Sequence, residues 1–216
     1  MFKRTGFVLM AMVGVALSAR SAAAAEVARY TFSGAQASFS FSGEVAVTCH
    51  DELGNEYPGY SLIQGYLQGG EQIYSDGYTG NGTYMQLFHY NSCTNVGGVA
   101  FGGTSGTFTP PDKKLDSAKM LGSGTVQSPD GSRIAVSFDA QIVGVGGISS
   151  SKAASHGKTA GTKNGPVFIS RDHSANSNRA GEASATITVN GVTFADLETY
   201  YAGLNINGTA TISISK

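Results

Sequence analysis

Hydrophobic and polar residues alternate with a period of two along several segments of this chain. Between residues 37 and 49 the odd positions are mostly apolar, whereas the even positions are mostly small or polar. In a β-strand this alternation places one face in a core and the other toward water. The same pattern recurs in residues 134–142, 183–189 and 206–214. Clean alternation of this kind is typical of antiparallel sheets that have one solvated face.

Turn-forming dipeptides separate these alternating segments. Asn-Gly and Asp-Gly pairs tolerate positive φ, and they predict tight turns or bulges at residues 76–77, 81–82, 130–131, 190–191 and 207–208. The best helical stretch, residues 194–202, is one or two turns long at most. We therefore predict an all-β fold, with a single antiparallel domain of the β-sandwich or jelly-roll type.

The first 25 residues have the organisation of a secretory signal peptide. Lys3 and Arg4 precede an apolar run over residues 6–17, and small residues end in Ala23-Ala24-Ala25. The apolar run is shorter than the ~20 residues that a spanning helix needs. We therefore expect a mature chain of residues 26–216, secreted or periplasmic, with no membrane anchor.

Composition and charge limit the partners of the mature chain. Charged residues make up only 13% of the sequence, and no second apolar run is long enough to predict a transmembrane span. Eight acidic residues and one arginine lie between Glu26 and Asp112, whereas ten basic and seven acidic residues follow from Lys113 onward. The overall balance gives no support for nucleic-acid binding.

Residues 144–181 differ in composition from the rest of the chain. This segment is rich in Ser, Gly, Ala, Lys and Asn, and only residues 166–169 form a short apolar run. Long loops in compact domains are usually functional or disordered. The segment is interpreted either as a mobile loop or weakly formed edge strands, or as a functional loop.

Cys49 and Cys93 are the only cysteines, and in an exported protein they predict one disulfide. The bond would close a loop of about 45 residues and contribute roughly 4 kcal/mol of stability in the chain-entropy model. The alternative is a metal site, because His50 adjoins Cys49 and His89 lies close to Cys93. Neighbouring residues of a strand point to opposite faces, which disfavours joint ligation by Cys49 and His50. We predict the disulfide and no metal.

Seven of the ten tyrosines lie between Tyr57 and Tyr90. If residues 83–90 form a strand, Tyr84, Phe88 and Tyr90 share one face, and Met85, Leu87 and His89 share the other. An exposed aromatic face with nearby amides suits sugar rings, although the chain contains no Trp. The alternative is that both faces are packed in the core. The candidate ligand-binding residues are Tyr66, Tyr74, Tyr84, Phe88 and Tyr90.

Other chemical signals are weak. Asp51, Glu52, Asn55 and Glu56 form an oxygen-rich cluster, but their spacing matches no EF-hand loop and predicts a polar surface loop. The sequence contains no G-x-S-x-G, H-E-x-x-H or P-loop motif. We therefore expect no cofactor and name no catalytic residue, although two carboxylates on separate strands could still support glycoside hydrolysis.

Several short motifs resemble those of a group of exported bacterial β-proteins of unassigned function. These motifs are Phe39-Ser40-Phe41 with Cys49, Tyr90 with Cys93, residues 179–186 and the closing Ile212-Ser213-Ile214. The resemblance spans most of the mature chain outside residues 144–181. It implies a bacterial secreted β-protein and brings no known activity or site residues.

The leading functional hypothesis is an exported, non-catalytic module that binds a carbohydrate or another surface polymer. A second hypothesis is a membrane-active or self-assembling β-protein, in which residues 144–181 rearrange into amphipathic strands. A third is a hydrolase with carboxylates on separate strands.

Overall fold

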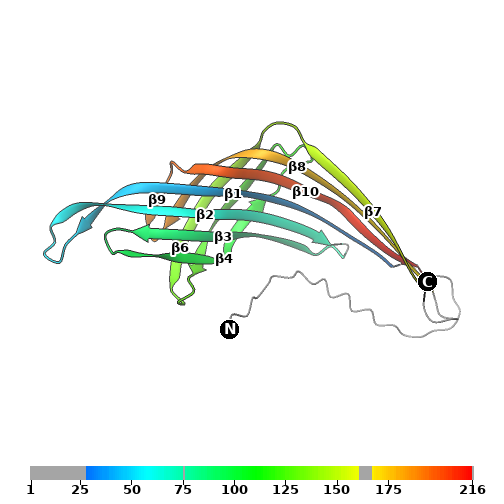
Figure 1. Ribbon diagram of the computed structural model, residues 1–216, viewed down its shortest axis with the longest axis horizontal. Coiled ribbons are helices and arrows are strands. Elements are labelled where there is room, and N and C mark those ends of the chain that lie inside the picture. The colour runs from blue at the N-terminus through cyan, green and yellow to red at the C-terminus, as the bar shows by residue number, and fades with distance from the viewer. Residues whose placement is uncertain (1–27, 75, 161–166, 216) are drawn as a thin grey trace.

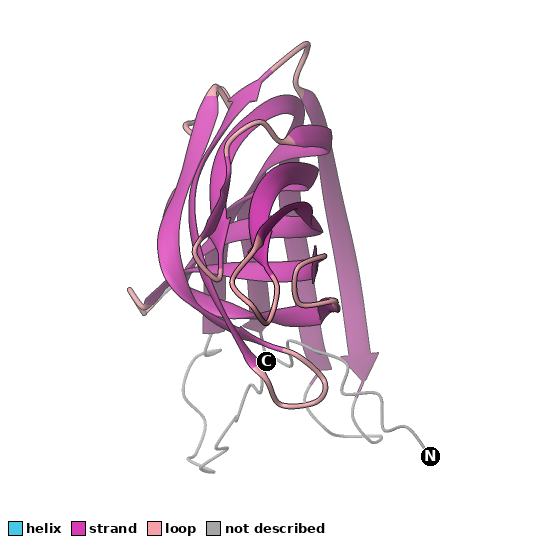
Figure 2. Cartoon of the chain, turned by 90° about the vertical axis from the view of Figure 1, so that its left-hand side faces the viewer, coloured by secondary structure: helices cyan, strands magenta, loops and turns pink. Residues whose placement is uncertain are grey.

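The computed structural model describes residues 28–74, 76–160 and 167–215, and the predicted signal peptide lies outside these ranges. The described residues contain ten strands and no helix. Figure 2 shows the described chain as strands joined by loops and turns. The strands are β1 (Ala28–His50), β2 (Glu56–Tyr74), β3 (Thr79–Asn91), β4 (Val96–Thr109), β5 (Ser117–Gln127), β6 (Arg133–Gly144), β7 (Ser149–Ala160), β8 (Val167–Val189), β9 (Val192–Phe194) and β10 (Glu198–Ser215). Among the described residues, no helix has the length and apolar character needed to cross a membrane.

All described strands belong to one antiparallel sheet, with the order β10-β1-β2-β3-β4-β5-β6-β8-β7. An additional pairing between β10 and β8 closes the sheet on itself, and β9 pairs with the end of β8. Figure 1 shows β1, β2, β8 and β10 as long curved strands that run side by side. The all-β antiparallel prediction is confirmed. The sandwich or jelly-roll arrangement is not confirmed, because the strands form one closed sheet.

The closure depends on β8, which changes its partner partway along its length. Residues 167–178 of β8 pair with β7, and residues 181–189 pair with β6. On its other side, β8 pairs with β10 between residues 169 and 180. One 23-residue strand therefore connects the two ends of the strand order.

The period-two alternation predicted from the sequence is present in the burial of the side chains. In β1 the side chains of Ala37, Phe39 and Phe41 are fully buried, and the intervening serines are only partly buried. In β6 the even positions from Ile134 to Ile142 are buried in the same core. The apolar faces of the strands thus enclose one continuous core, and the opposite faces form the outer surface.

Most of the predicted turns are confirmed by the backbone, but the predicted helical stretch is wrong. Gly77, Gly131, Asn190 and Gly191 have positive φ in the turns between strands. The Asn81-Gly82 pair instead lies inside β3, and residues 207–208 lie at a register shift in β10. Residues 194–202 comprise the end of β9, a connection over residues 195–197 and the start of β10, because cross-strand pairing with β1 overrides their local helical tendency.

The polar segment 144–181 is largely β-strand where it is described. It forms β7 and the first part of β8, with residues 161–166 outside the described ranges. In Figure 1 these strands extend with β10 to one end of the molecule. Among the described residues β7 pairs only with β8, whereas β8 is paired on both sides.

The predicted disulfide is present and joins the end of β1 to the turn after β3. The Cα atoms of Cys49 and Cys93 are 5.1 Å apart. Cys49 is almost completely buried on the apolar face of β1. Because both sulfurs are bonded to each other, neither cysteine is free to ligate a metal.

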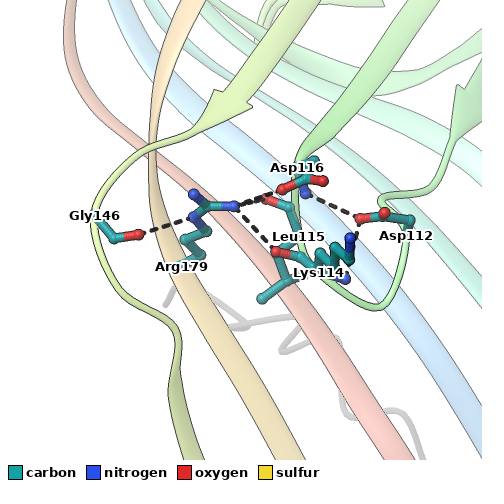
Figure 3. Close-up of polar contacts among 6 residues, drawn as sticks. All are labelled: Asp112, Lys114, Leu115, Asp116, Gly146 and Arg179. Atoms are coloured by element: carbon teal, nitrogen blue, oxygen red, sulfur yellow. Dashed lines mark hydrogen bonds and ion pairs between the residues drawn. The ribbon is translucent and has the colours of Figure 1, made fainter.

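Arg179 fixes the region where β8 changes partner (Figure 3). Its Nε donates to the carbonyl of Gly146 at 3.1 Å, and its Nη1 donates to Asp116 Oδ1 at 2.8 Å. The same Nη1 also donates to the carbonyls of Lys114 and Leu115. Leu115 is fully buried with a φ of 55°, so one cation stabilises a strained loop and the turn before β7.

We predict that Arg179→Ala lowers the free energy of unfolding by about 2–3 kcal/mol, because hydrogen bonds to charged groups are worth about that much each. Urea unfolding followed by circular dichroism measures the loss. The exposed Arg133 at the start of β6 provides the control, and Arg133→Ala is expected to unfold like the wild type. Equal stability of the two variants would contradict the role assigned to Arg179.

Candidate ligand-binding surface

All five candidate ligand-binding residues lie on the outer face of β2 and β3. The inner face of these strands carries the buried Ile63, Leu67, Met85 and Leu87 at odd positions. The even positions therefore point outward. They include Tyr66 and Tyr74 in β2 and Tyr84, Phe88 and Tyr90 in β3.

The exposed fractions of these side chains show whether the five residues lie at the surface or in the core. Tyr84 and Phe88 are each 40% exposed, and Tyr74 is 38% exposed. Tyr66 and Tyr90 are partly buried. The aromatic residues therefore lie at the surface and do not fill the core.

Hydrogen bonds to neighbouring amides orient three of the tyrosine rings. The hydroxyl of Tyr66 donates to Gln68 Oε1 at 3.1 Å, and that of Tyr74 donates to Gln72 Oε1 at 2.7 Å. Tyr90 donates to Asn95 Oδ1 at 3.0 Å. Each bond ties a phenol to a side-chain amide, so rings and amides form one layer on the outer face.

Aromatic rings and glutamines alternate across the strand pair. Three consecutive outward-facing pairs each contain one ring and one glutamine, and the ring changes strand at every step: Gln64–Phe88, Tyr66–Gln86 and Gln68–Tyr84. Cross-strand neighbours of this kind lie about 5 Å apart, and successive pairs are about 7 Å apart along the strand. The result is a checkerboard of flat apolar groups and hydrogen-bonding amides. We call these six residues the ring–amide surface.

Four further apolar residues extend this surface, and none of them was predicted from the sequence. Val99 and Phe101 of β4 are opposite Phe88 and Gln86, and both are more than 40% exposed. Tyr200 and Tyr201 of β10 are each 63% exposed. A β-bulge explains this tandem exposure, because Tyr201 pairs with Ser40 whereas the next pair joins Thr199 to Phe41. The pair Tyr200-Tyr201 was the available signal, but it lay in the segment predicted to be helical.

The ring–amide surface contains a shallow depression of about 340 Å³. Tyr66, Phe88, Val99 and Tyr200 provide its apolar lining, and Gln64 and Gln86 provide amides. Residues from β10, β2, β3 and β4 therefore meet in one place, although they are far apart in the sequence.

The centre of this surface is uncharged, whereas one end is acidic. No outward-facing position of β2 or β3 from residue 64 to residue 72 or from residue 80 to residue 90 is charged. Beside it, Glu44, Asp196 and Glu198 line a depression of about 440 Å³. The hydroxyl of Tyr200 donates to Glu198 Oε2 at 3.1 Å and shares a 2.5 Å hydrogen bond with Ser42.

The other candidate chemistry does not assemble into a metal site. Within the described ranges, no group of three or more His, Cys, Asp or Glu side chains is placed to hold a metal ion. The carboxylate of Asp51 accepts hydrogen bonds from Leu53 and from the backbone and side chain of Asn55. The side-chain bond from Asn55, followed by its backbone bond, lowers the pKa of Asp51. Within the oxygen-rich cluster, the Asp51 carboxylate therefore accepts its hydrogen bonds from residues of its own turn.

No protein-family model, curated protein or solved structure matches this chain. The function proposed below therefore depends on the outer-face residues and their chemistry.

His89 is a titratable group behind the ring–amide surface. It lies on the inner side of β3, opposite the buried Ile63 of β2 and Gly98 of β4. Burial lowers the pKa of this imidazole from its usual value of 6.5, because a low-dielectric environment disfavours the charged form.

We predict that acid destabilises the wild type more than it destabilises a His89→Gln variant. The unfolded chain binds a proton at His89 more tightly than the folded chain does, so stability rises with pH in this range. The penalty is absent well above pH 6.5 and grows as the pH falls through 6.5 toward the lower folded pKa. Urea unfolding between about pH 7.5 and pH 5 measures it. His50→Gln, at an exposed position, is the control, and identical pH profiles for all three proteins would refute the effect.

Proposed function

We propose that this protein is an exported, non-catalytic module that binds a neutral polysaccharide on the ring–amide surface. The observation that supports the proposal is the checkerboard of Phe88, Tyr66 and Tyr84 with Gln64, Gln86 and Gln68. Rings offer flat apolar contact, and amides offer both donors and acceptors. Sugars match this chemistry, because each ring has apolar C–H faces and hydroxyl groups at its edge.

Charge favours a neutral polymer over an anionic one. The centre of the surface has no charged residue, and Glu44, Asp196 and Glu198 lie beside it. Carboxylates repel an anionic polymer, and the long Lys and Arg side chains that bind phosphates are absent from the outward positions of β2 and β3.

Export to a secreted or periplasmic location is part of the proposal. The signal peptide predicted over residues 1–25 supports it. The Cys49–Cys93 disulfide is consistent with it, because such bonds persist in oxidising compartments.

Hydrolysis is a second candidate, because Glu44, Asp196 and Glu198 line one depression. Glycosidases use two carboxyl groups, one of which is usually kept protonated by burial. All three residues are exposed here, and this favours binding without catalysis. Release of reducing sugars from a bound polysaccharide, lost in Glu198→Gln, would establish the hydrolase instead.

We predict that the wild type binds at least one insoluble or soluble neutral polysaccharide, and that Tyr66→Ala and Phe88→Ala each weaken binding about tenfold, equivalent to about 1.4 kcal/mol. Pull-down and affinity electrophoresis with cellulose, chitin, xylan, mannan, laminarin and starch measure the effect.

Leu121→Ala is the matched control, because Leu121 is 57% exposed on the outer face of β5, away from the ring–amide surface. It is expected to bind like the wild type. The proposal fails if no polysaccharide binds, or if Tyr66→Ala/Phe88→Ala binds as well as Leu121→Ala while both remain folded by circular dichroism.

A further inference from the structure

Two depressions on the outer face adjoin each other next to the ring–amide surface, and we call them together the trough. One has a volume of about 730 Å³ and lies over β8, β10 and β1. The other, of about 500 Å³, lies over β1, β2 and β3. Gln36 and Asn207 line both depressions and mark where they meet.

One row of cross-strand neighbours forms the floor of this trough. Asn178 of β8 pairs with Asn205 of β10, which pairs with Gln36 of β1. Gln36 pairs with Gly70 of β2, which pairs with Gly82 of β3. We call these five residues the trough floor. It crosses five strands, a distance of about 19 Å at the usual strand spacing.

Aromatic residues lie on one side of the floor, with Tyr84 in the next outward-facing row and Tyr201 in the row after it. Tyr201 lines the larger depression, and Tyr84 lines the smaller one. Tyr84 also belongs to the ring–amide surface, so the trough and that surface share a wall. The trough floor contains no charged residue.

The side-chain amides of Asn178, Asn205 and Gln36 give the floor hydrogen-bond donors and acceptors. The Asn205 side-chain amide donates to Asn178 Oδ1, and this one bond uses only part of the capacity of the two amides. Beyond Gln36 the floor consists of Gly70 and Gly82, which carry no side chain. A Cβ built on Gly70 or Gly82 meets no atom within 4 Å, so packing within the fold does not require glycine at either position. Glycine inside a strand often marks close approach of a ligand.

We propose that the trough holds consecutive sugars of an unbranched neutral polysaccharide whose chain crosses the strands from β8 to β3. This inference depends on the proposed function and specifies the length and direction of its ligand. A trough of about 19 Å accommodates about four sugars of an extended chain at roughly one sugar per strand spacing. The amides of Gln36, Asn178 and Asn205 bind hydroxyl groups, and Tyr84 and Tyr201 contact ring faces.

Titration calorimetry with hexasaccharides of β-1,4-linked glucose, N-acetylglucosamine, xylose and mannose, β-1,3-linked glucose and α-1,4-linked glucose tests the inference. The di- and tetrasaccharide of the best-binding series follow. The blocking variant is Gly82→Val, whose side chain enters open space in the trough. The control is Gly98→Val on the inner side of β4, where a Cβ also meets no atom within 4 Å and which lies outside the trough. Gln36→Ala removes one amide, and urea midpoints verify that each variant is folded.

We expect the tetrasaccharide to bind at least tenfold more tightly than the disaccharide. Gly82→Val and Gln36→Ala should abolish this gain, and Gly98→Val should retain it. Equal affinity for the di- and tetrasaccharide, or wild-type affinity in Gly82→Val, would overturn the inference that the trough binds consecutive sugars. The proposed function would remain intact in that case if Tyr66→Ala/Phe88→Ala still loses binding. Absence of binding by all six hexasaccharides would overturn both.

Discussion

The fold depends on the backbone hydrogen bonds of β8. A strand at the edge of a sheet exposes unpaired amide and carbonyl groups, and β8 satisfies its groups on both sides by pairing with four different strands. The change of partner near residue 180 leaves a junction where β6, β7 and the loop before β5 meet. Arg179 occupies this junction and binds three carbonyls and one carboxylate. The change of strand partner thus leaves carbonyls that the partly buried, charged side chain of Arg179 satisfies.

Closure of the sheet also determines what the outer surface can do. The apolar face of each strand turns inward, so every second residue is exposed over a continuous outer face. β10 lies between β1 and β8, which brings Tyr201 beside Ser40 and Asn205 beside Gln36. The trough floor therefore combines residues from both ends of the chain, and Tyr200 of β10 lines the depression on the ring–amide surface. Paired strands hold the side chains of the proposed binding surface.

Local patterns in the sequence predicted the features that depend only on the geometry of a single strand or turn. Alternation around Phe39 and Phe41, the Asn190-Gly191 turn and the shared face of Tyr84 and Phe88 all follow from strand geometry and glycine φ preference, whereas the sequence left open whether that face lay outside or in the core. The features that failed depend on long-range pairing. The segment around Tyr200 has helical tendency, but β1 recruits it into the sheet, and the bulge that exposes Tyr200 and Tyr201 together cannot be read from alternation. The trough was also invisible, because its five floor residues come from five strands.

Hydrogen-exchange mass spectrometry, with and without a saturating concentration of the best-binding hexasaccharide, measures whether a sugar chain binds the outer face of these strands. Exchange reports local opening of backbone hydrogen bonds, and a ligand on the outer face slows opening of the strands beneath it. We expect slower exchange in peptides covering residues 34–42, 64–72, 80–90 and 200–207, with no change in residues 117–127 and 133–144. Protection confined to β5 and β6, or no protection anywhere, would contradict it.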